Sequence, residues 1–238
     1  MNKINTEEYL ANLSIDCVIF GYEHGELKVL LGKLSFGNEL YNLPGGHIRK
    51  TESVDHAAAR LLKERTQLKD LFLKQFKVFG NEKRIIESPY RELMQAQLSK
   101  KHSEKEVAWI TSRFVCVGYY ALVDIAQVEV ITGAIEEQFE WKSIHDIPEL
   151  VYDHREILEE ALIALRNNFD QHLNANNLLP ETFTMKELQQ VYETVFEKSF
   201  PMNNFQKKML DLGVLERLEK KYTGSQHKAP YLYRFKVC

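Results

Sequence analysis

Apolar and polar residues alternate in blocks along the first third of the chain. Residues 14–20 and 26–31 are rich in aliphatic side chains, and the stretch between them contains two glycines. Apolar runs bounded by glycine-containing turns are typical of β-strands, so this pattern predicts a hairpin. Three further segments have the same character and are expected to be strands: 72–79, 114–123 and 138–142. The first half of the chain should therefore contain a β-sheet.

Two segments carry apolar residues at helical spacing. In residues 53–65 the apolar face consists of Val54, Ala57, Ala58, Leu61 and Leu62. In residues 154–169 it consists of Ile157, Leu158, Ala161, Leu162 and Leu165. Both patterns predict amphipathic helices. Residues 83–108 are polar and charged instead, and we interpret them as a partly helical insertion or flap.

A second pattern begins after the asparagine-rich residues 167–177. Thr184 and Glu187 have the spacing of a capping box, which predicts a helix that runs to about residue 196. A second helix, with Phe205, Met209 and Leu212 toward the core, should end at Gly213. Two strands, 214–222 and 231–236, should follow, joined by the polar loop 223–230. This order of elements is that of the second half of a winged helix-turn-helix.

The composition is that of an ordinary globular protein. The chain has 238 residues, 44% hydrophobic and 27% charged, which suits one or two domains. We find no apolar run of the roughly 18 residues that would span a membrane, and the polar N-terminus lacks the features of a signal peptide. Cys17, Cys116 and Cys238 are far apart and odd in number, so we expect neither a disulfide framework nor a metal site. We therefore expect a cytoplasmic protein without membrane association.

The charge is unevenly distributed. Residues 201–236 contain eight lysines and arginines against three acidic residues, a formal charge of +5. Because the whole chain carries −3, the remainder carries about −8. This asymmetry favours an anionic partner for the C-terminal part, although a solvated basic surface is the alternative.

Residues 46–68 resemble the Nudix box, G-x5-E-x7-R-E-U-x-E-E-x-G-U, where U is aliphatic. Six of its nine fixed positions are present: Gly46, Glu52, Arg60, Leu62, Glu64 and Leu68. Three differ: Leu61, Arg65 and Gln67. The resemblance covers about residues 12–150. It implies an α/β/α sandwich with a mixed sheet, in which Glu52 and Arg60 form a structural ion pair between loop and helix.

The three differences bear on the chemistry. Nudix hydrolases hold Mg²⁺ or Mn²⁺ with carboxylates on this helix, and hard cations need several oxygen ligands. Here only Glu64 supplies a carboxylate, Leu61 offers no ligand, and Arg65 brings a positive charge to the site. We therefore expect no catalytic residues, no bound metal and no cofactor. The alternative is a hydrolase of the ADP-ribose pyrophosphatase type, in which Glu52 and Glu64 would hold the metal.

A Nudix fold without metal still contains a pocket that can bind a small effector. Arginines suit contacts with phosphates and sugars, although a solvated surface position is the alternative for each of them. The predicted effector-binding residues are Asp16, Gly45, Gly46, His47, Glu64, Arg65 and Arg84.

The basic C-terminal module is predicted to bind DNA. Asparagine and glutamine can bind adenine edges in the major groove, and lysines contact phosphates or guanine. The predicted contacts from the two helices are Thr184, Lys186, Asn203, Asn204, Gln206, Lys207 and Lys208, and those from the wing are Ser225, Gln226, His227 and Lys228. A small helical domain used only for dimerisation is the alternative.

The two halves together resemble the Nudix-related transcriptional regulators, in which a degenerate Nudix domain precedes a winged helix. The stretch 178–193 resembles that family's domain junction, and Asn204-Phe205 followed by Lys207-Lys208 its recognition helix. The resemblance implies an α+β protein with an effector-sensing domain in residues 1–150, a linker helix in 151–177 and a DNA-binding domain in 178–238. It also implies a homodimer on palindromic double-stranded operator DNA, regulated by a sugar or an ADP-ribose-like metabolite. A pure protein-interaction module is a further alternative, which the basic residues disfavour.

Overall fold

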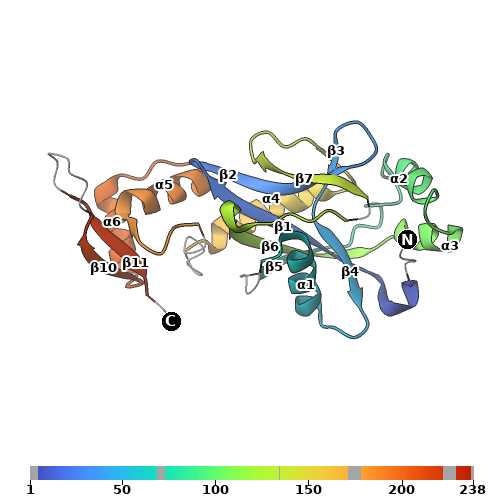
Figure 1. The fold of residues 1–238 in the computed structure, drawn as a ribbon, viewed down its shortest axis with the longest axis horizontal. Helices are drawn as coiled ribbons and strands as arrows, with labels where there is room; N and C mark the ends of the chain where they lie inside the picture. The colour runs from blue at the N-terminus through green and yellow to red at the C-terminus, as the bar shows by residue number, and fades with distance from the viewer. Residues whose placement is uncertain (1–4, 69–72, 134, 171–177, 222–228, 237–238) are drawn as a thin grey trace.

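The computed structural model describes most of the chain: residues 5–68, 73–133, 135–170, 178–221 and 229–236. A large sheet with its helices occupies one end of an elongated molecule, and a smaller group of helices and strands occupies the other (Figure 1). Within the described ranges, no helix is long and apolar enough to cross a membrane.

The large sheet has eight strands and is mixed. Its central strand β1 (Tyr9–Glu23) runs parallel to β6 (Val115–Asp124) and antiparallel to β2 (Glu26–Leu34) and β4 (Gly45–Arg49). The other strands are β3 (Leu40–Asn42), β5 (Leu73–Phe79), β7 (Glu136–Ser143) and β8 (Glu149–Leu150). The five strands predicted from the sequence are all present. β3, β4 and β8 were not predicted, because runs of two to five residues carry too little periodicity.

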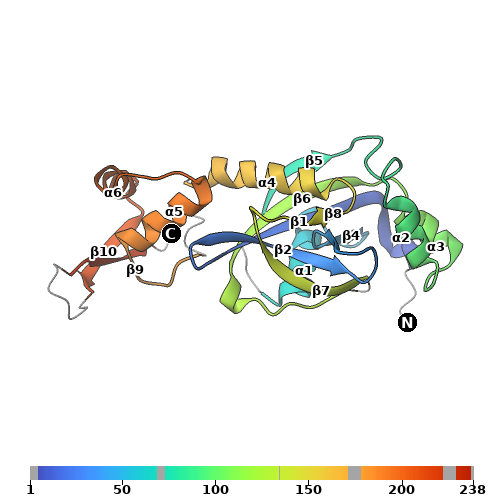
Figure 2. The ribbon, with the colours of Figure 1, turned by 90° about the horizontal axis from the view of Figure 1, so that it is seen from above.

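Helices cover both faces of this sheet. Along β1, Ile15, Cys17 and Ile19 pack toward α1 (Val54–Thr66), whereas Val18 and Phe20 pack toward α4 (His154–Asn168). The alternation follows from the two-residue period of a strand. Figure 2 shows α1 and α4 on opposite sides of the sheet. The predicted α/β/α sandwich is confirmed.

The segment 83–108 contributes two short helices, α2 (Arg91–Leu98) and α3 (Glu104–Ile110). The expectation of partial helicity is confirmed. Some of its side chains are buried, however, which the polar composition did not indicate. It has a small apolar core of its own, in which helix residues pack against the sheet: Met94, Leu98 and Val107 with Leu34, Leu40 and Val151.

The C-terminal group contains α5 (Met185–Phe196), α6 (Met202–Asp211) and a hairpin of β10 (Leu215–Lys220) and β11 (Tyr231–Phe235). The predicted capping box at the start of α5 is present. An unpredicted strand, β9 (Phe183–Thr184), pairs with β11 and makes the sheet three-stranded. These elements form the predicted winged helix.

The two ends of the molecule are packed together. Phe169, which follows α4, is fully buried, and its ring lies 5.0 Å from that of Tyr192 on α5. The β1–β2 hairpin reaches the same helix, because Thr194 Oγ1 donates a hydrogen bond to the carbonyl of Gly25 at 3.0 Å. Gly25 has a φ of +81°, which suits the two-residue turn of a hairpin. Helix α4 and this hairpin therefore both join the large sheet to the winged helix.

The prediction is wrong for one core residue. Leu212 was expected to face the core, but it is 41% exposed. Helix α6 ends at Asp211, and the buried positions on its inner face are Phe205 and Met209. Most of the loop predicted at 223–230 lies outside the described residues.

Replacing Phe205 by alanine should unfold the winged helix more readily than a matched change on the surface of the same helix. Phe205 is 2% exposed, so its loss should cost about 3–5 kcal/mol in the free energy of unfolding. Leu210→Ala is the control, because Leu210 is 45% exposed. Urea unfolding followed by circular dichroism measures both variants. Equal destabilisation by the two would contradict this packing.

Candidate functional site

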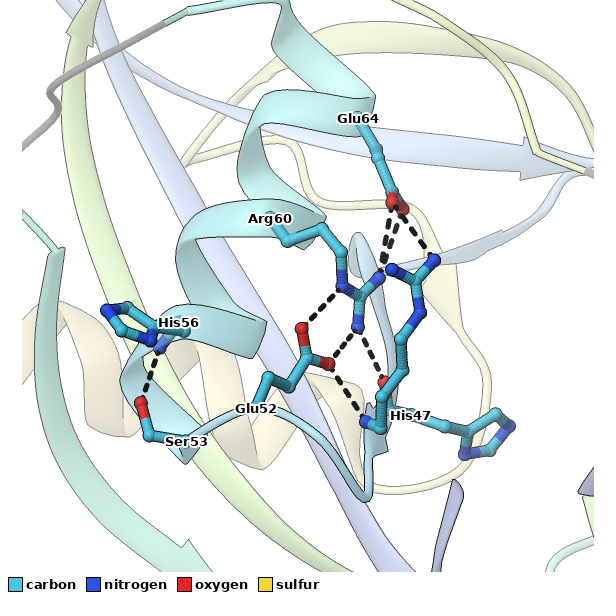
Figure 3. A network of polar contacts seen from close by, with 7 residues as sticks. His47, Glu52, Ser53, His56, Arg60 and Glu64 are labelled. Atoms are coloured by element: carbon cyan, nitrogen blue, oxygen red, sulfur yellow. Dashed lines mark hydrogen bonds and ion pairs between the residues drawn. The ribbon is translucent and has the colours of Figure 1, made fainter. Parts of the chain in front are cut away.

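The loop before α1 is fixed to the helix by one arginine. Arg60 donates to Glu52 through Nε (2.9 Å) and Nη2 (2.6 Å), and Nη2 also donates to the carbonyl of His47 at 3.0 Å. Glu52 in turn accepts a hydrogen bond from the backbone amide of Arg49 at 2.8 Å. Figure 3 shows Arg60 between the Glu52 carboxylate and the backbone of His47. This is the loop-to-helix ion pair expected from the Nudix box.

Glu64 forms an ion pair with the same arginine, Arg60. Its carboxylate lies 3.3 Å from Arg60 Nη1 and 4.0 Å from Arg49 Nη2, and its side chain is 47% exposed. Leu61 is buried against Gly46, where a Cβ would stand 2.6 Å from Leu61 Cδ2. In the part of the chain that the structure describes, no three histidine, cysteine or carboxylate side chains gather as a metal site would require.

Arg65 extends away from Glu64. Its guanidinium lies over the ring of Phe139 on β7, 5.9 Å from the ring centre, whereas Glu64 faces Arg49 on β4. The two adjacent side chains therefore do not converge on one point. Any ligand contact by Arg65 would lie on the β7 side of the helix.

The two glycines of the loop allow close packing. A Cβ on Gly45 would lie 2.4 Å from Asp16 Oδ1 and 2.6 Å from the carbonyl of Ile15. A Cβ on Gly46 would meet Leu61, as described above. Neither position can accept a side chain without rearrangement, so both glycines have a packing role beside any contact with an effector.

Arg84 is not a surface residue, which corrects the alternative of a solvated position; its role in effector binding stays a prediction. Its side chain is 3% exposed. It donates to both carboxylate oxygens of Asp153 (2.6 and 2.8 Å) and to the carbonyl of Phe114 (3.0 Å). Nη2 lies 3.6 Å from Asp16 Oδ2. Since Arg84 and Asp16 already have these partners, an effector could bind them only by replacing existing contacts.

His154, the first residue of α4, is a neighbour of Arg84 that was not singled out from the sequence. Its Nδ1 accepts a hydrogen bond from the amide of Leu43 at 2.9 Å, and its Nε2 lies 3.9 Å from Asp16 Oδ2. Burial lowers the pKa of this imidazole, which favours its neutral form. The start of α4 is thus attached both to the loop before β4 and to β1. The 111-residue separation between Leu43 and His154 explains why no local pattern revealed this contact.

His47 lies in an aromatic cluster rather than among charged groups. Its ring centre is 4.5 Å from that of Trp109 on α3 and 5.0 Å from that of Phe114. Burial lowers the pKa of His47 to about 4, so the imidazole is neutral at physiological pH. It can therefore offer a hydrogen bond or a ring face to an effector, but not a positive charge.

Helix α6 carries five of the eleven predicted DNA contacts. Asn203, Asn204 and Lys207 are exposed, and Gln206 is partly exposed. A shallow hollow of about 450 Å³ lies along the exposed face of this helix and is lined by Asn204, Lys207, Lys208, Asp211 and Leu212. Amides and ammonium groups are therefore presented to solvent on a helix whose opposite face is buried.

Two predicted contacts have other roles in the structure. Thr184 is 7% exposed, and its hydroxyl closes the capping box with Glu187, so its side chain does not reach the surface. Lys208 Nζ lies 2.6 Å from Asp170 Oδ2 and 5.5 Å from the ring centre of Tyr192, which ties α6 to the end of α4. Lys186, in the first turn of α5, is exposed as expected.

The wing sheet carries cations that the sequence prediction missed. Arg217 and Lys220 on β10 are exposed, and both lie over the ring of Tyr231, at 3.4 and 5.4 Å from its centre. The available signal was weak: two basic residues three positions apart on one predicted strand and a tyrosine on its predicted partner. The predicted wing-tip residues Ser225, Gln226, His227 and Lys228 lie outside the described residues.

Replacing Glu52 by glutamine should destabilise the chain at neutral pH and less at acidic pH. Its hydrogen bonds with Arg60 lower the pKa of Glu52 to about 2. The pair therefore stabilises the fold fully above the ordinary pKa of the carboxyl group and loses this effect as the pH falls through about 2. We expect a loss of about 2–3 kcal/mol at pH 7 and roughly half of that at pH 3.

Urea unfolding at the two pH values measures this difference, with the exposed Glu82→Gln as the control. A loss of stability that is the same at pH 7 and pH 3 would show that the charge of Glu52 does not matter.

Comparisons with known proteins agree with this architecture. Residues 175–235 match the NrtR DNA-binding winged helix domain. The "ADPR responsive transcriptional repressor NtrR" of Acinetobacter baylyi is 26% identical over 230 residues, which cover 94% of this chain and 81% of the relative. The crystal structure of Shewanella oneidensis NrtR superposes with a TM-score of 0.70 at 25% identity, covering 94% of both chains. The same protein complexed with a 27mer DNA gives a TM-score of 0.69 at 25% identity, covering 94% of this chain and 93% of that one.

The Nudix-like sandwich, the matched winged helix and these full-length similarities lead to one conclusion. The chain is similar along most of its length to Nudix-related transcriptional regulators, and its residues 175–235 match the winged helix domain of the NrtR type.

Proposed function

We propose that this protein is a transcriptional repressor that binds operator DNA through its winged helix and responds to ADP-ribose bound in its Nudix-like domain. The observation that carries the proposal is the exposed amide and lysine face of α6 on a winged helix domain of the NrtR type. A relative similar along 94% of this chain is named an ADPR responsive repressor, and a similar structure contains DNA.

In this proposal α6 reads the major groove. Asn203, Asn204 and Gln206 supply amides that can pair with adenine edges, and Lys207 supplies a cation for phosphate or guanine. Lys186, in the first turn of α5, is placed to contact the backbone. Thr184 and Lys208 are not included as direct contacts, because one is buried and the other pairs with Asp170.

The wing completes the interface. Arg217 and Lys220 on β10 are exposed cations on the wing sheet, and we add them to the predicted contacts from the loop that follows. Those loop contacts, Ser225, Gln226, His227 and Lys228, remain predictions. Phosphate contacts of this kind fix the register of a protein on DNA without reading its sequence.

The Nudix-like domain is proposed to recognise its ligand without cleaving it. One similar protein is named a repressor, and the carboxylate of Glu64 is already paired with Arg60 and Arg49. Leu61 supplies no further ligand. We also propose that residues 1–150 sense the effector, that 178–238 bind DNA, and that two copies of the chain bind a palindromic operator.

Helix α4 is proposed to transmit the signal. Its first turn is fixed by Asp153, which binds Arg84, and by His154, which binds the amide of Leu43. Its far end leads to Phe169 in the core shared with α5. A ligand that changes the contacts of Asp16 or Arg84 would therefore move α4 and the winged helix. Such a ligand acts only through its different affinity for the two arrangements.

Substitutions on α6 should separate base reading from phosphate binding. We expect Asn204→Ala to weaken binding to the operator by about 1–3 kcal/mol and to relax base preference at one position. Lys207→Ala should weaken binding to all duplexes and reduce the salt slope by about one. Fluorescence anisotropy with a duplex from the protein's own promoter and a scrambled duplex measures both, with the exposed Lys105→Ala as the control.

The proposal for α6 fails if Asn204→Ala and Lys207→Ala each bind the two duplexes with the affinities of the wild-type protein.

Substitution of Asp153 should reduce communication between the two ends of the molecule. Asp153→Asn removes the charge that holds Arg84, so ADP-ribose should still bind while its effect on operator affinity decreases. Couplings of this kind are typically fivefold or more, and we expect the ratio of operator affinities with and without ADP-ribose to fall to within about twofold. The control is Glu156→Gln on the same helix, where the side chain is 60% exposed. A ratio equal to that of the wild-type protein would exclude this route.

A further inference from the structure

Three buried polar atoms lie without a hydrogen-bond partner near the end of α1. They are Asn42 Oδ1, Arg65 Nε and Glu136 Oε2, and none of them has a partner in the part of the chain that the structure describes. Asn42 is 8% exposed. Burying a donor or acceptor without a hydrogen bond is unfavourable, so three of them in one place indicate that something else satisfies them.

The three groups are held together by β3, α1 and β7. Asn42 Nδ2 donates to Glu136 Oε1 at 3.1 Å, which leaves the other oxygen of each group unpaired. Glu136 Oε2 and both terminal nitrogens of Arg65 lie within 2.7 Å of the point where a Cβ on Gly133 would stand. No ion pair joins Arg65 and Glu136 among the described residues, although both charged ends lie next to Gly133.

On the other side of the cluster, Gly32 is also a position where a side chain would clash. A Cβ on Gly32 would lie 2.4 Å from Asn42 Oδ1, 2.9 Å from Glu136 Cγ and 3.0 Å from the ring of Phe139. The same Phe139 ring lies beneath the guanidinium of Arg65. Two glycines and an aromatic ring therefore border the three unpaired atoms closely, and neither glycine could carry a side chain without displacing them.

The charges of the cluster decide which ligand it fits. One arginine and one glutamate cancel, so the cluster has no excess of positive charge to hold a phosphate, and its arginine disfavours a metal ion. The free atoms are two acceptors and one donor. A hydroxyl group between Arg65 and Glu136 can accept from the first and donate to the second. A neighbouring hydroxyl can donate to Asn42 Oδ1.

We propose that Asn42, Arg65 and Glu136 form a subsite for the vicinal diol of a ribose. This proposal rests on the proposed function for its choice of ligand, since ADP-ribose carries two such diols, one on the adenosine and one on the terminal ribose. It assigns the sugar, rather than a phosphate, to Arg65. It also adds Asn42 and Glu136, which the sequence did not single out, to the effector site.

Glu136→Gln and Arg65→Lys test the subsite, and Glu137→Gln is the matched control because Glu137 is exposed on the same strand. Calorimetry on the full chain measures the affinity for ADP-ribose and for ADP, which lacks the terminal ribose. We expect Glu136→Gln and Arg65→Lys each to bind ADP-ribose at least tenfold more weakly, since each removes a hydrogen bond to or from a charged group. Glu137→Gln should bind as the wild-type protein does.

The two probes distinguish the two diols. A loss in Glu136→Gln that is seen with ADP-ribose but not with ADP assigns the terminal ribose, and an equal loss with both assigns the adenosine ribose. Thermal unfolding confirms that each variant is folded. If Glu136→Gln does not fold, the comparison of ADP-ribose with ADP is made with Arg65→Lys.

Two results would overturn the subsite. In the first, both variants bind ADP-ribose as tightly as the wild-type protein and differ only in thermal stability, as expected if the three atoms hold a water molecule. In the second, the wild-type protein does not bind ADP-ribose. Operator binding without ligand is measured in parallel. Its absence would refute the repressor proposal, whereas a loss of ligand affinity in the variants would still support the subsite.

Discussion

The bidentate contact between Arg60 and Glu52 is the interaction on which the Nudix-like domain depends. It joins the loop before α1 to the helix itself, and through the carbonyl of His47 it also fixes β4. The same guanidinium pairs with Glu64, the only glutamate among residues 61, 64 and 65. One guanidinium thus pairs with both carboxylates of the motif. The contact that fixes the loop to the helix is therefore also one on which the proposal of binding without hydrolysis rests.

The second constraint is the placement of α4. One end of this helix begins in a buried polar network, where Asp153 and His154 contact Arg84 and the amide of Leu43. The other end leads into aromatic packing of Phe169 against Tyr192. Polar networks respond to a ligand through exchange of hydrogen bonds, whereas aromatic packing transmits a shift as a rigid contact. This arrangement is the basis for the proposal that α4 transmits an effect of the ligand to the winged helix.

The features that could be predicted from the sequence are those that depend on residues close together in the chain. Three features are of this kind: the apolar face of α1, the Glu52–Arg60 pair and the capping box at Thr184. Each involves only residues that lie within one short stretch of sequence. The burial of Arg84 was not predictable, because its partner Asp153 is 69 residues away. Asn42 and Glu136, 94 residues apart, meet only once β3 and β7 have both paired with β2. The sequence therefore predicted the architecture and the basic face of α6, whereas the polar contacts of the pocket required the folded sheet.

The most direct test of the account is to incubate the full chain with ADP-ribose and Mg²⁺ or Mn²⁺, and to measure both binding and breakdown of the ligand. The account predicts that ADP-ribose binds and is recovered intact, with no AMP formed above the level of a protein-free control. Metal-dependent release of AMP and ribose 5-phosphate that disappears in Glu64→Gln would contradict it, because Glu64 would then hold a metal despite its pairing with Arg60.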